Sequence, residues 1–262
     1  MNKIKLMIII SFAVMIISAA IGVAVYYSYL QPFRVAANTG NLEDVLSHVT
    51  YLEYNATDQD GNVYLVKLWN YPSNKSGKAE LYVNNQLNYT FYYSYSGTGL
   101  SYGKIEYANG TVREYAGADV VLIEDYFLTS LAYSYNQQNN TVDEFKPFPG
   151  VGPVYLHKFL ADRVQLDWGT MASITRTGEL SPLVDVRVGA GDVKLMGETL
   201  SGATVTLVPK VISPPTPWAR LIYSLVIVDY NGNALIPAWS ITITVPGKEY
   251  RVSYTLINYN SG

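Results

Sequence analysis

The chain has 262 residues, no cysteine, two histidines and 15% charged residues, whereas an average soluble domain carries about 25% charged residues. Without cysteine it holds no disulfide, thiolate metal site, iron–sulfur cluster or thiol nucleophile, and two histidines cannot form a three-histidine zinc site. The formal net charge of −3 argues against a nucleic-acid partner, which would require a basic footprint.

An uncharged apolar run fills residues 6–30. As a helix, these 25 residues would extend over roughly 37 Å, enough to cross a hydrocarbon core of about 30 Å. We therefore expect residues 1–31 to form a transmembrane anchor with the lipid bilayer as its partner. A cleaved signal peptide is the alternative, because Ser-Ala-Ala at 18–20 is compatible with a cleavage site, although a signal core is usually only about 7–15 residues long.

Charged and aromatic residues mark the two ends of this run. Lys3 and Lys5 precede it, so the positive-inside rule places the N-terminus in the cytoplasm and the bulk of the chain outside the cell. Tyr26, Tyr27 and Tyr29 at the other end are typical of a membrane interface. The expected localisation is the cell membrane, with a single pass.

A linker with a short helix is expected over residues 32–49. Pro32 ends or kinks the membrane helix, because proline lacks the backbone donor and clashes with the preceding turn. Asn41 suits the N-cap of a helix over 42–49, whose first turn is acidic.

Residues 50–140 carry the alternation and turn signals of an antiparallel β-meander of five or six strands. Asn84-Asn85 and Asn109-Gly110 suit tight hairpins, because these residues tolerate positive φ. Fifteen of the 24 tyrosines lie here, and we expect rings such as that of Tyr93 to be buried while their hydroxyls stay in water. Apolar spacings of three and four predict one helix over 119–135, capped by Asp119, that covers a face of the meander.

A second exported domain is expected after a Pro- and Gly-rich linker at 141–153. Within 154–262, a short helix at 154–163 is followed by strand-like runs and turn residues, which together predict a β-sandwich of the immunoglobulin-like type. Gly189-Ala190-Gly191 is interpreted as a turn between two of these strands. The predicted fold class is therefore mainly β, with an N-terminal transmembrane helix, a meander domain with one covering helix, and a C-terminal sandwich.

The search for chemistry finds no catalytic, cofactor or metal motif. His48 and His157 lie in different predicted regions, so we do not expect them to share a metal ion. Adjacent carboxylates occur at 124–125, where helix geometry would point them apart, and at 143–144 in the predicted linker. We expect no enzyme activity and no cofactor.

Asn-x-Ser/Thr sequences recur in the first exported domain, at a modest excess over chance and in several cases at predicted turns. We expect some of them to be glycosylated. Their acceptors are Asn55, Asn74, Asn88, Asn109 and Asn139.

The low charge density favours an exported domain that faces an acidic medium, because few basic groups limit repulsion once the carboxylates are protonated. A glycan-covered surface is the alternative explanation. In composition, although in no motif, the chain resembles exported proteins of thermoacidophilic archaea.

Three functional hypotheses follow. The first is a membrane-anchored, extracytoplasmic structural or interaction protein of the cell surface that acts by protein–protein contact. The second is an accessory, non-catalytic subunit of a membrane complex for respiration or transport, in which Ser18 and Gly22 provide a small-xxx-small packing face. The third, a filament or pilus-type subunit, ranks lower because residues 3–5 offer no small residue for processing before the apolar run.

Overall fold

The structure is a computed structural model. It describes residues 42–97, 99–136, 141–156, 184–209, 220–231, 233–245 and 247–262. Within these ranges, no helix has the length and apolar character needed to cross a membrane. The expected anchor over 1–31, with its interface and packing residues, lies outside the described residues, as do His157 and Asn139.

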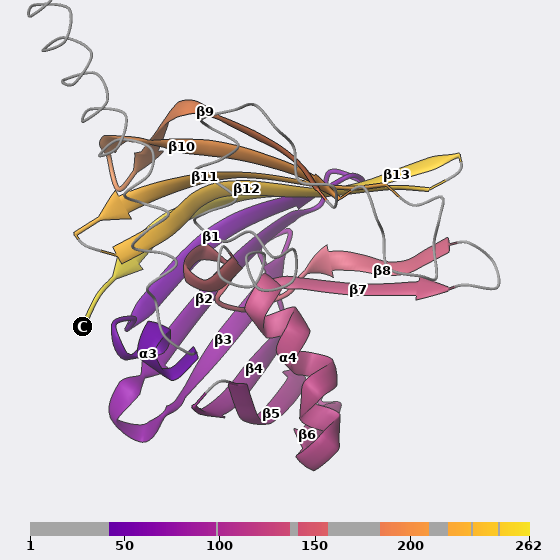
Figure 1. The fold of residues 1–262 in the computed structure, drawn as a ribbon. Coiled ribbons are helices and arrows are strands. Elements are labelled where there is room, and N and C mark those ends of the chain that lie inside the picture. Colours follow the sequence, from indigo (N-terminus) through magenta and orange to yellow (C-terminus); the bar gives the residue numbers. More distant parts are fainter. Residues whose placement is uncertain are drawn as a thin grey trace, which may run out of the picture.

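A single antiparallel sheet of eleven described strands dominates the fold (Figure 1). The strand order is β6-β5-β4-β3-β2-β1-β13-β12-β11-β10-β9, so two meanders are joined in the middle of the sheet where the last strand pairs with the first, and β6 and β9 are its edge strands. Its N-terminal half consists of β1 (Tyr51–Asp58), β2 (Val63–Tyr71), β3 (Ser76–Val83), β4 (Gln86–Ser96), β5 (Gly99–Tyr107) and β6 (Val112–Ala116). Its C-terminal half consists of β9 (Val184–Leu195), β10 (Glu198–Pro209), β11 (Arg220–Tyr230), β12 (Asn233–Val245) and β13 (Lys248–Asn260).

The meander expected between 50 and 140 is confirmed in strands β1–β6. Asn84 and Asn85 have φ values of 49° and 67°, and Gly110 has a φ of 84°, as tight hairpin turns require. The pleat of each strand places alternate residues on opposite faces of the sheet. The burial pattern of β2, exposed or half-buried at every second residue, follows from that alternation.

The C-terminal sandwich is the main correction to the predicted fold. A sandwich requires two sheets packed face to face, whereas the described strands β9–β13 continue the sheet that contains β1–β6. The join is the antiparallel pairing of β1 with β13, which runs from Tyr51↔Asn260 to Asp58↔Val252. Alternation along a strand reveals which residues face the core but not which strand lies beside it.

The expected turn at residues 189–191 is a second correction. These residues lie inside β9, where Gly189, Ala190 and Gly191 pair with residues of β10. A Cβ at position 191 would collide with the Cγ2 atom of Thr204, so glycine here permits close approach rather than a change of direction.

The helix expected over 119–135 is shorter than predicted. Helix α4 (Val120–Thr129) ends at Ser130, which has a left-handed φ of 57° and donates its N–H to the carbonyl of Tyr126. The next residues form β7 (Leu131–Asn136), which pairs with β8 (Thr141–Pro147) in a separate two-stranded sheet. Asp119 stands at the N-cap position but forms no capping hydrogen bond through its side chain.

Short helical segments connect the remaining elements. Helix α3 (Leu42–Ser47) occupies most of the helix expected at 42–49, and residues 152–156 form another helical turn at the start of the one expected at 154–163. The two 3₁₀ turns are η2 (Pro72–Asn74) and η3 (Gly117–Asp119).

The hydrophobic core lies between one face of the sheet, called here the inner face, and a cover formed by α3, α4, the β7–β8 hairpin and residues 148–156 (Figure 1). Aromatic rings fill this layer: the ring centroids of Phe127 and Tyr93 are 4.6 Å apart, and those of Phe91 and Phe148 are 5.2 Å apart. Hydrogen bonds attach the cover to the sheet, because Tyr254 Oη donates to the carbonyl of Ser130 at 3.0 Å. The predicted covering of the meander by a helix is thus observed.

Candidate functional site: the open face of the sheet

The opposite side of strands β1–β5, called here the open face, carries a connected set of polar contacts. The covering helices and the hairpin pack against the inner face, through residues such as Phe127 and Tyr254. On the open face, ten side chains from five adjacent strands stand side by side. They form two rows that run across the strands.

Register fixes the membership of the two rows. In the first, called the lysine row, each residue pairs with the next across neighbouring strands. Its members are Tyr51, Trp69, Lys78, Tyr92 and Lys104. The second, called the glutamate row, lies two residues along each strand and is joined by the same pairings. Its members are Glu53, Lys67, Glu80, Thr90 and Glu106.

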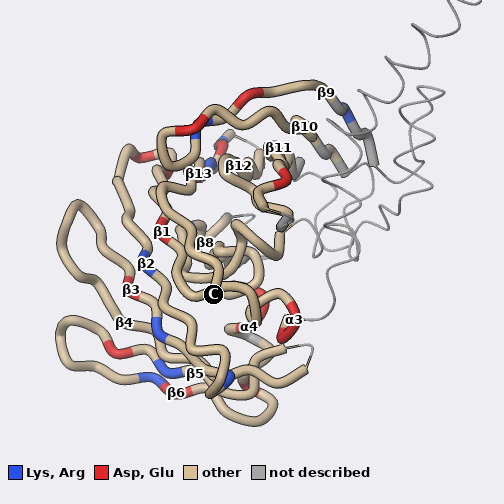
Figure 2. The backbone as a smooth tube through the Cα atoms, turned by 90° about the vertical axis from the view of Figure 1, so that its left-hand side faces the viewer, with Lys and Arg blue, Asp and Glu red and all other residues tan. Residues whose placement is uncertain are grey.

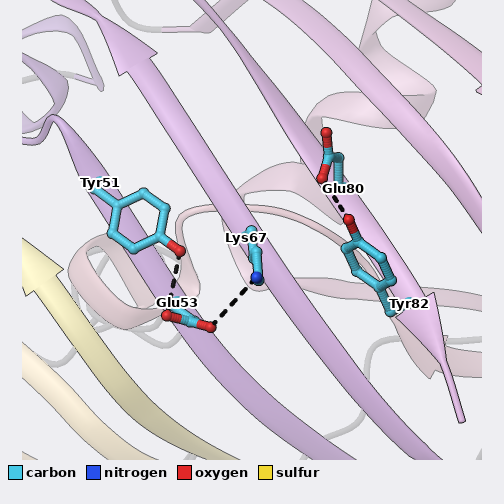
Figure 3. A network of polar contacts seen from close by, with 5 residues as sticks. All are labelled: Tyr51, Glu53, Lys67, Glu80 and Tyr82. Atoms are coloured by element: carbon cyan, nitrogen blue, oxygen red, sulfur yellow. Dashed lines mark hydrogen bonds and ion pairs between the residues drawn. The ribbon is translucent and has the colours of Figure 1, made fainter. Parts of the chain in front are cut away.

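Hydrogen bonds and ion pairs join neighbouring members of the rows (Figure 3). Tyr51 Oη donates to Glu53 Oε2 at 3.2 Å, and Lys67 Nζ lies 3.9 Å from Glu53 Oε1. Tyr82, two residues beyond the glutamate row on β3, donates its hydroxyl to Glu80 Oε2 at 2.7 Å. Each carboxylate drawn in this network therefore has a donor from an adjacent aromatic residue.

Two lysines bridge the rows along their own strands. Lys78 Nζ donates to Glu80 Oε1 at 3.1 Å, and Lys104 Nζ donates to Glu106 Oε1 at 2.7 Å. The same ammonium groups lie over aromatic rings of the next strand, 4.4 Å from the Trp69 centroid and 4.7 Å from the Tyr92 centroid. Each of these lysines thus combines an ion pair with a cation–π contact.

The pKa values reflect these contacts. Burial alone would raise the pKa of Glu80, but hydrogen bonds from Tyr82 and Lys78 outweigh it and hold the pKa below its usual range. The hydrogen bond from Lys104 lowers the pKa of Glu106. Burial, together with the nearby charge of Glu53, raises the pKa of Tyr51 to about 12. These groups therefore keep their ordinary charge states at neutral pH.

The charged groups of the two open-face rows balance one another. The two rows contain three lysines and three glutamates, so their formal charges cancel. The pKa shifts given above lower the pKa values of Glu80 and Glu106 and raise that of Tyr51, in each case away from pH 7. In the part of the chain that the structure describes, no three His, Cys, Asp or Glu side chains come together as metal ligands.

The residues singled out for chemistry in the sequence do not converge. Glu124 Oε2 accepts the backbone N–H of Leu100 at 3.0 Å, so it holds the start of β5 against α4. The backbone carbonyl of His48 accepts a hydrogen bond from Tyr259 at 3.3 Å, and its imidazole is exposed. Glu144 is exposed on β8.

Four of the five sequon asparagines lie in described parts of the chain, and all four are exposed. Asn55 and Asn88 project from strands β1 and β4. Asn74 lies in η2, and Asn109 lies in the β5–β6 turn, where its Oδ1 accepts the N–H of Thr111 at 3.0 Å. Asn55 and Asn88 are each two residues along the strand from a member of the glutamate row, Glu53 and Thr90, whereas Asn74 and Asn109 lie in turns.

Sequence reasoning missed the open-face rows. A signal for them exists, because Lys78 with Glu80 and Lys104 with Glu106 are opposite charges two residues apart, which places them on one face of a strand. The alignment of the pairs across β3, β4 and β5 depends on register shifts between Leu81 and Tyr82 and between Ser94 and Tyr95. Those shifts have no local pattern in the sequence.

No protein-family model matches the chain, and no curated protein matches its sequence. The arrangement of side chains on the open face is therefore the basis for a functional proposal.

Proposed function

We propose that this chain is a membrane-anchored, extracytoplasmic protein of the cell surface that acts by protein–protein contact, with the open face of β1–β5 as its contact surface. The observation that supports it most directly is the pair of rows, in which aromatic rings and compensated charges cover five adjacent strands. Tyrosine and tryptophan are enriched at protein interfaces, because they combine apolar area with a polar end. The anchor and its orientation rest on the apolar run at 6–30 and the lysines that precede it.

The charge balance of the face favours a protein partner over a polyelectrolyte. A polyanion would need a surplus of lysine or arginine, and the two rows provide none. Charged residues are also sparse over the rest of the chain (Figure 2). Long-range steering by net charge is therefore weak, and specificity has to come from the positions of individual rings and ion pairs.

Glycosylation is the second part of the proposal. Asn74 and Asn109 lie in turns, so glycans there would leave the two rows clear. Glycans on Asn55 or Asn88 would stand on strands of the open face and would hinder contact. We therefore expect glycopeptide analysis of native protein to find occupancy at Asn74 or Asn109, and full occupancy of Asn55 would contradict the contact role.

A photo-cross-linking residue placed at Thr90, in the middle of the face, tests the contact surface in native membranes. The expected result is specific cross-linked products from Thr90 and none from Lys194, an exposed residue of β9 far from the rows in the sheet order. Multi-span membrane proteins among the products would identify an accessory subunit, and a ladder of identical chains would identify a filament. Absence of any product from Thr90 would contradict the proposal.

A further inference from the structure

The two rows have a symmetry property that points to a specific partner. On each of β1, β2, β3 and β5, the residue in the lysine row and the residue in the glutamate row are of complementary types: a hydroxyl and a carboxylate, a ring and an ammonium, or an ammonium and a carboxylate. The four pairs are Tyr51 with Glu53, Trp69 with Lys67, Lys78 with Glu80, and Lys104 with Glu106. Three of them form direct contacts along their own strand, at 3.2, 3.1 and 2.7 Å.

A two-fold axis lying in the plane of the face, parallel to the rows and midway between them, exchanges one row for the other. In a face-to-face pair of molecules related by this axis, the lysine row of one copy lies over the glutamate row of the second copy. Lys78 would then face Glu80 and Lys104 would face Glu106 of the second copy, twice each. Trp69 would face Lys67, which reproduces between molecules the cation–π chemistry that Lys78 makes with this ring within the sheet.

We infer that the open face binds the open face of a second copy of this chain, with the lysine row of each copy against the glutamate row of the other. Such an interface is isologous, the commonest arrangement in homodimers. Charge complementarity sets the register, because sliding one copy by a single row would oppose lysine to lysine in one direction and glutamate to glutamate in the other. The inference rests on the proposed contact function and names its partner.

The available area is compatible with a dimer. Five strands at about 4.8 Å spacing and about nine residues of about 3.4 Å rise give a face of roughly 700 Å². A standard stable interface buries about 800 Å² on each partner. The ion pairs already present within each copy reduce the gain on association, so we expect a dimer of moderate affinity that weakens as salt is added.

Charge reversal tests the inference in the full chain, produced without glycans and held in detergent micelles. An acidic variant carries Lys78→Glu and Lys104→Glu, and a basic variant carries Glu80→Lys and Glu106→Lys. Each variant alone opposes like charges and loses its ion pairs within the chain. Mixed together, the two variants oppose an acidic face to a basic face, which no contact within one molecule can reproduce.

Sedimentation across a concentration series provides the readout. We expect the wild type to dimerise, each variant alone to associate at least about tenfold more weakly, and the equimolar mixture to recover or exceed the wild-type association. A matched control, Lys194→Glu with Lys248→Glu, makes the same change in net charge on exposed residues of β9 and β13 and should leave dimerisation unchanged. Circular dichroism verifies that each variant is folded, and Lys78→Gln with Lys104→Gln replaces the acidic variant if charge reversal prevents folding.

Two outcomes would overturn the inference: a wild type that stays monomeric at every concentration, or a mixture that associates no more than its separate components. The cross-linking experiment separates this failure from that of the proposed function. Products between Thr90 and a different protein, with a monomeric wild type, would reject self-association and leave the contact role standing. A dimer in micelles with no product from Thr90 in native membranes would instead count against the contact role.

Discussion

Polar side chains enter the core of this protein together with their hydrogen-bond partners. Tyr93 is 1% exposed, and its hydroxyl donates to Asn70 Oδ1 at 3.3 Å. The expectation from the sequence that this hydroxyl stays in water is therefore wrong. The Asn70 amide in turn donates to the carbonyls of Leu46 and Val49 at 2.7 and 2.9 Å. One amide therefore connects α3, its following turn and two strands of the sheet.

Removal of this amide should be costly. We expect Asn70→Ala to lower the free energy of unfolding by about 3 kcal/mol, because the buried carbonyls of Leu46 and Val49 lose the amide donor and the Tyr93 hydroxyl keeps only the Trp69 carbonyl as an acceptor. Urea unfolding of the full chain in detergent measures the change. Asn55→Gln, an exposed asparagine on β1, serves as the control and should change it by less than about 0.5 kcal/mol. An equal effect of the two substitutions would show that the buried amide contributes nothing specific.

The hydroxyl of Tyr54 makes a similar connection between the sheet and its cover. It donates to the carbonyl of Phe148 at 2.8 Å and accepts the N–H of Gly150 at 3.1 Å. We expect Tyr54→Phe to cost about 1–2 kcal/mol of unfolding free energy, since both backbone groups remain buried without a partner. Tyr51→Phe removes a half-buried hydroxyl on the open face and should cost clearly less, so a reversed ranking in thermal melts would contradict the assignment.

At the scale of elements, a glycine sets how closely β2, β3 and β4 pack. A Cβ on Gly77 of β3 would collide with the carbonyl oxygen of Trp69 on β2 and with the hydroxyl of Tyr93 on β4. The carbonyl is part of the backbone and cannot turn aside without disturbing the Asn70↔Gly77 pairing. The ring of Tyr93 therefore occupies the space that any larger residue at position 77 would need.

Gly77→Ala is accordingly expected to destabilise the chain by about 2 kcal/mol or more, as overpacking does in well-filled cores. It should also loosen the two rows of the open face, because Lys78 follows directly in the chain. Thermal unfolding followed by circular dichroism checks the stability. Ser76→Ala, at the neighbouring half-buried position, should have little effect, and a wild-type melting curve for Gly77→Ala would refute the packing argument.

The sequence was informative about elements and uninformative about their long-range partners. The hairpins at Asn84-Asn85 and Asn109-Gly110 were predictable, because turn chemistry is local. The pairing of Tyr51 with Asn260 was not, since no local pattern links strands at opposite ends of the described chain. The open-face rows were missed for the same reason: each Lys–Glu pair is visible within one strand, while their alignment into rows depends on register across several strands.

At the scale of the whole molecule, several carboxylates respond to pH in the same direction. The pKa of Glu43 is lowered by its hydrogen bond with Lys75, and that of Glu106 by Lys104. For Asp58 and Glu80, burial acts in the opposite direction, but hydrogen bonds outweigh it and both pKa values are lowered. A folded pKa below the unfolded value means that ionisation stabilises the fold.

The pH dependence of stability follows from these lowered carboxylate pKa values. The stabilisation is fully present above the unfolded pKa values, which are about 4, and is lost as pH falls through the lower folded values. We therefore expect a lower melting temperature at pH 2 than at pH 6. Glu80→Gln with Glu106→Gln should reduce this difference, because two of the responsible carboxylates are then absent.

Loss of these contacts need not unfold the chain. Acid denaturation also requires repulsion among the positive charges that remain, and only 18 lysines and arginines are spread over 262 residues. Their low density, together with a core built largely from tyrosine and aliphatic side chains, predicts that far-UV circular dichroism at pH 2 still reports a folded β-sheet. Loss of that spectrum between pH 4 and pH 2 would contradict an acid-facing domain and favour glycan cover as the reason for the low charge density.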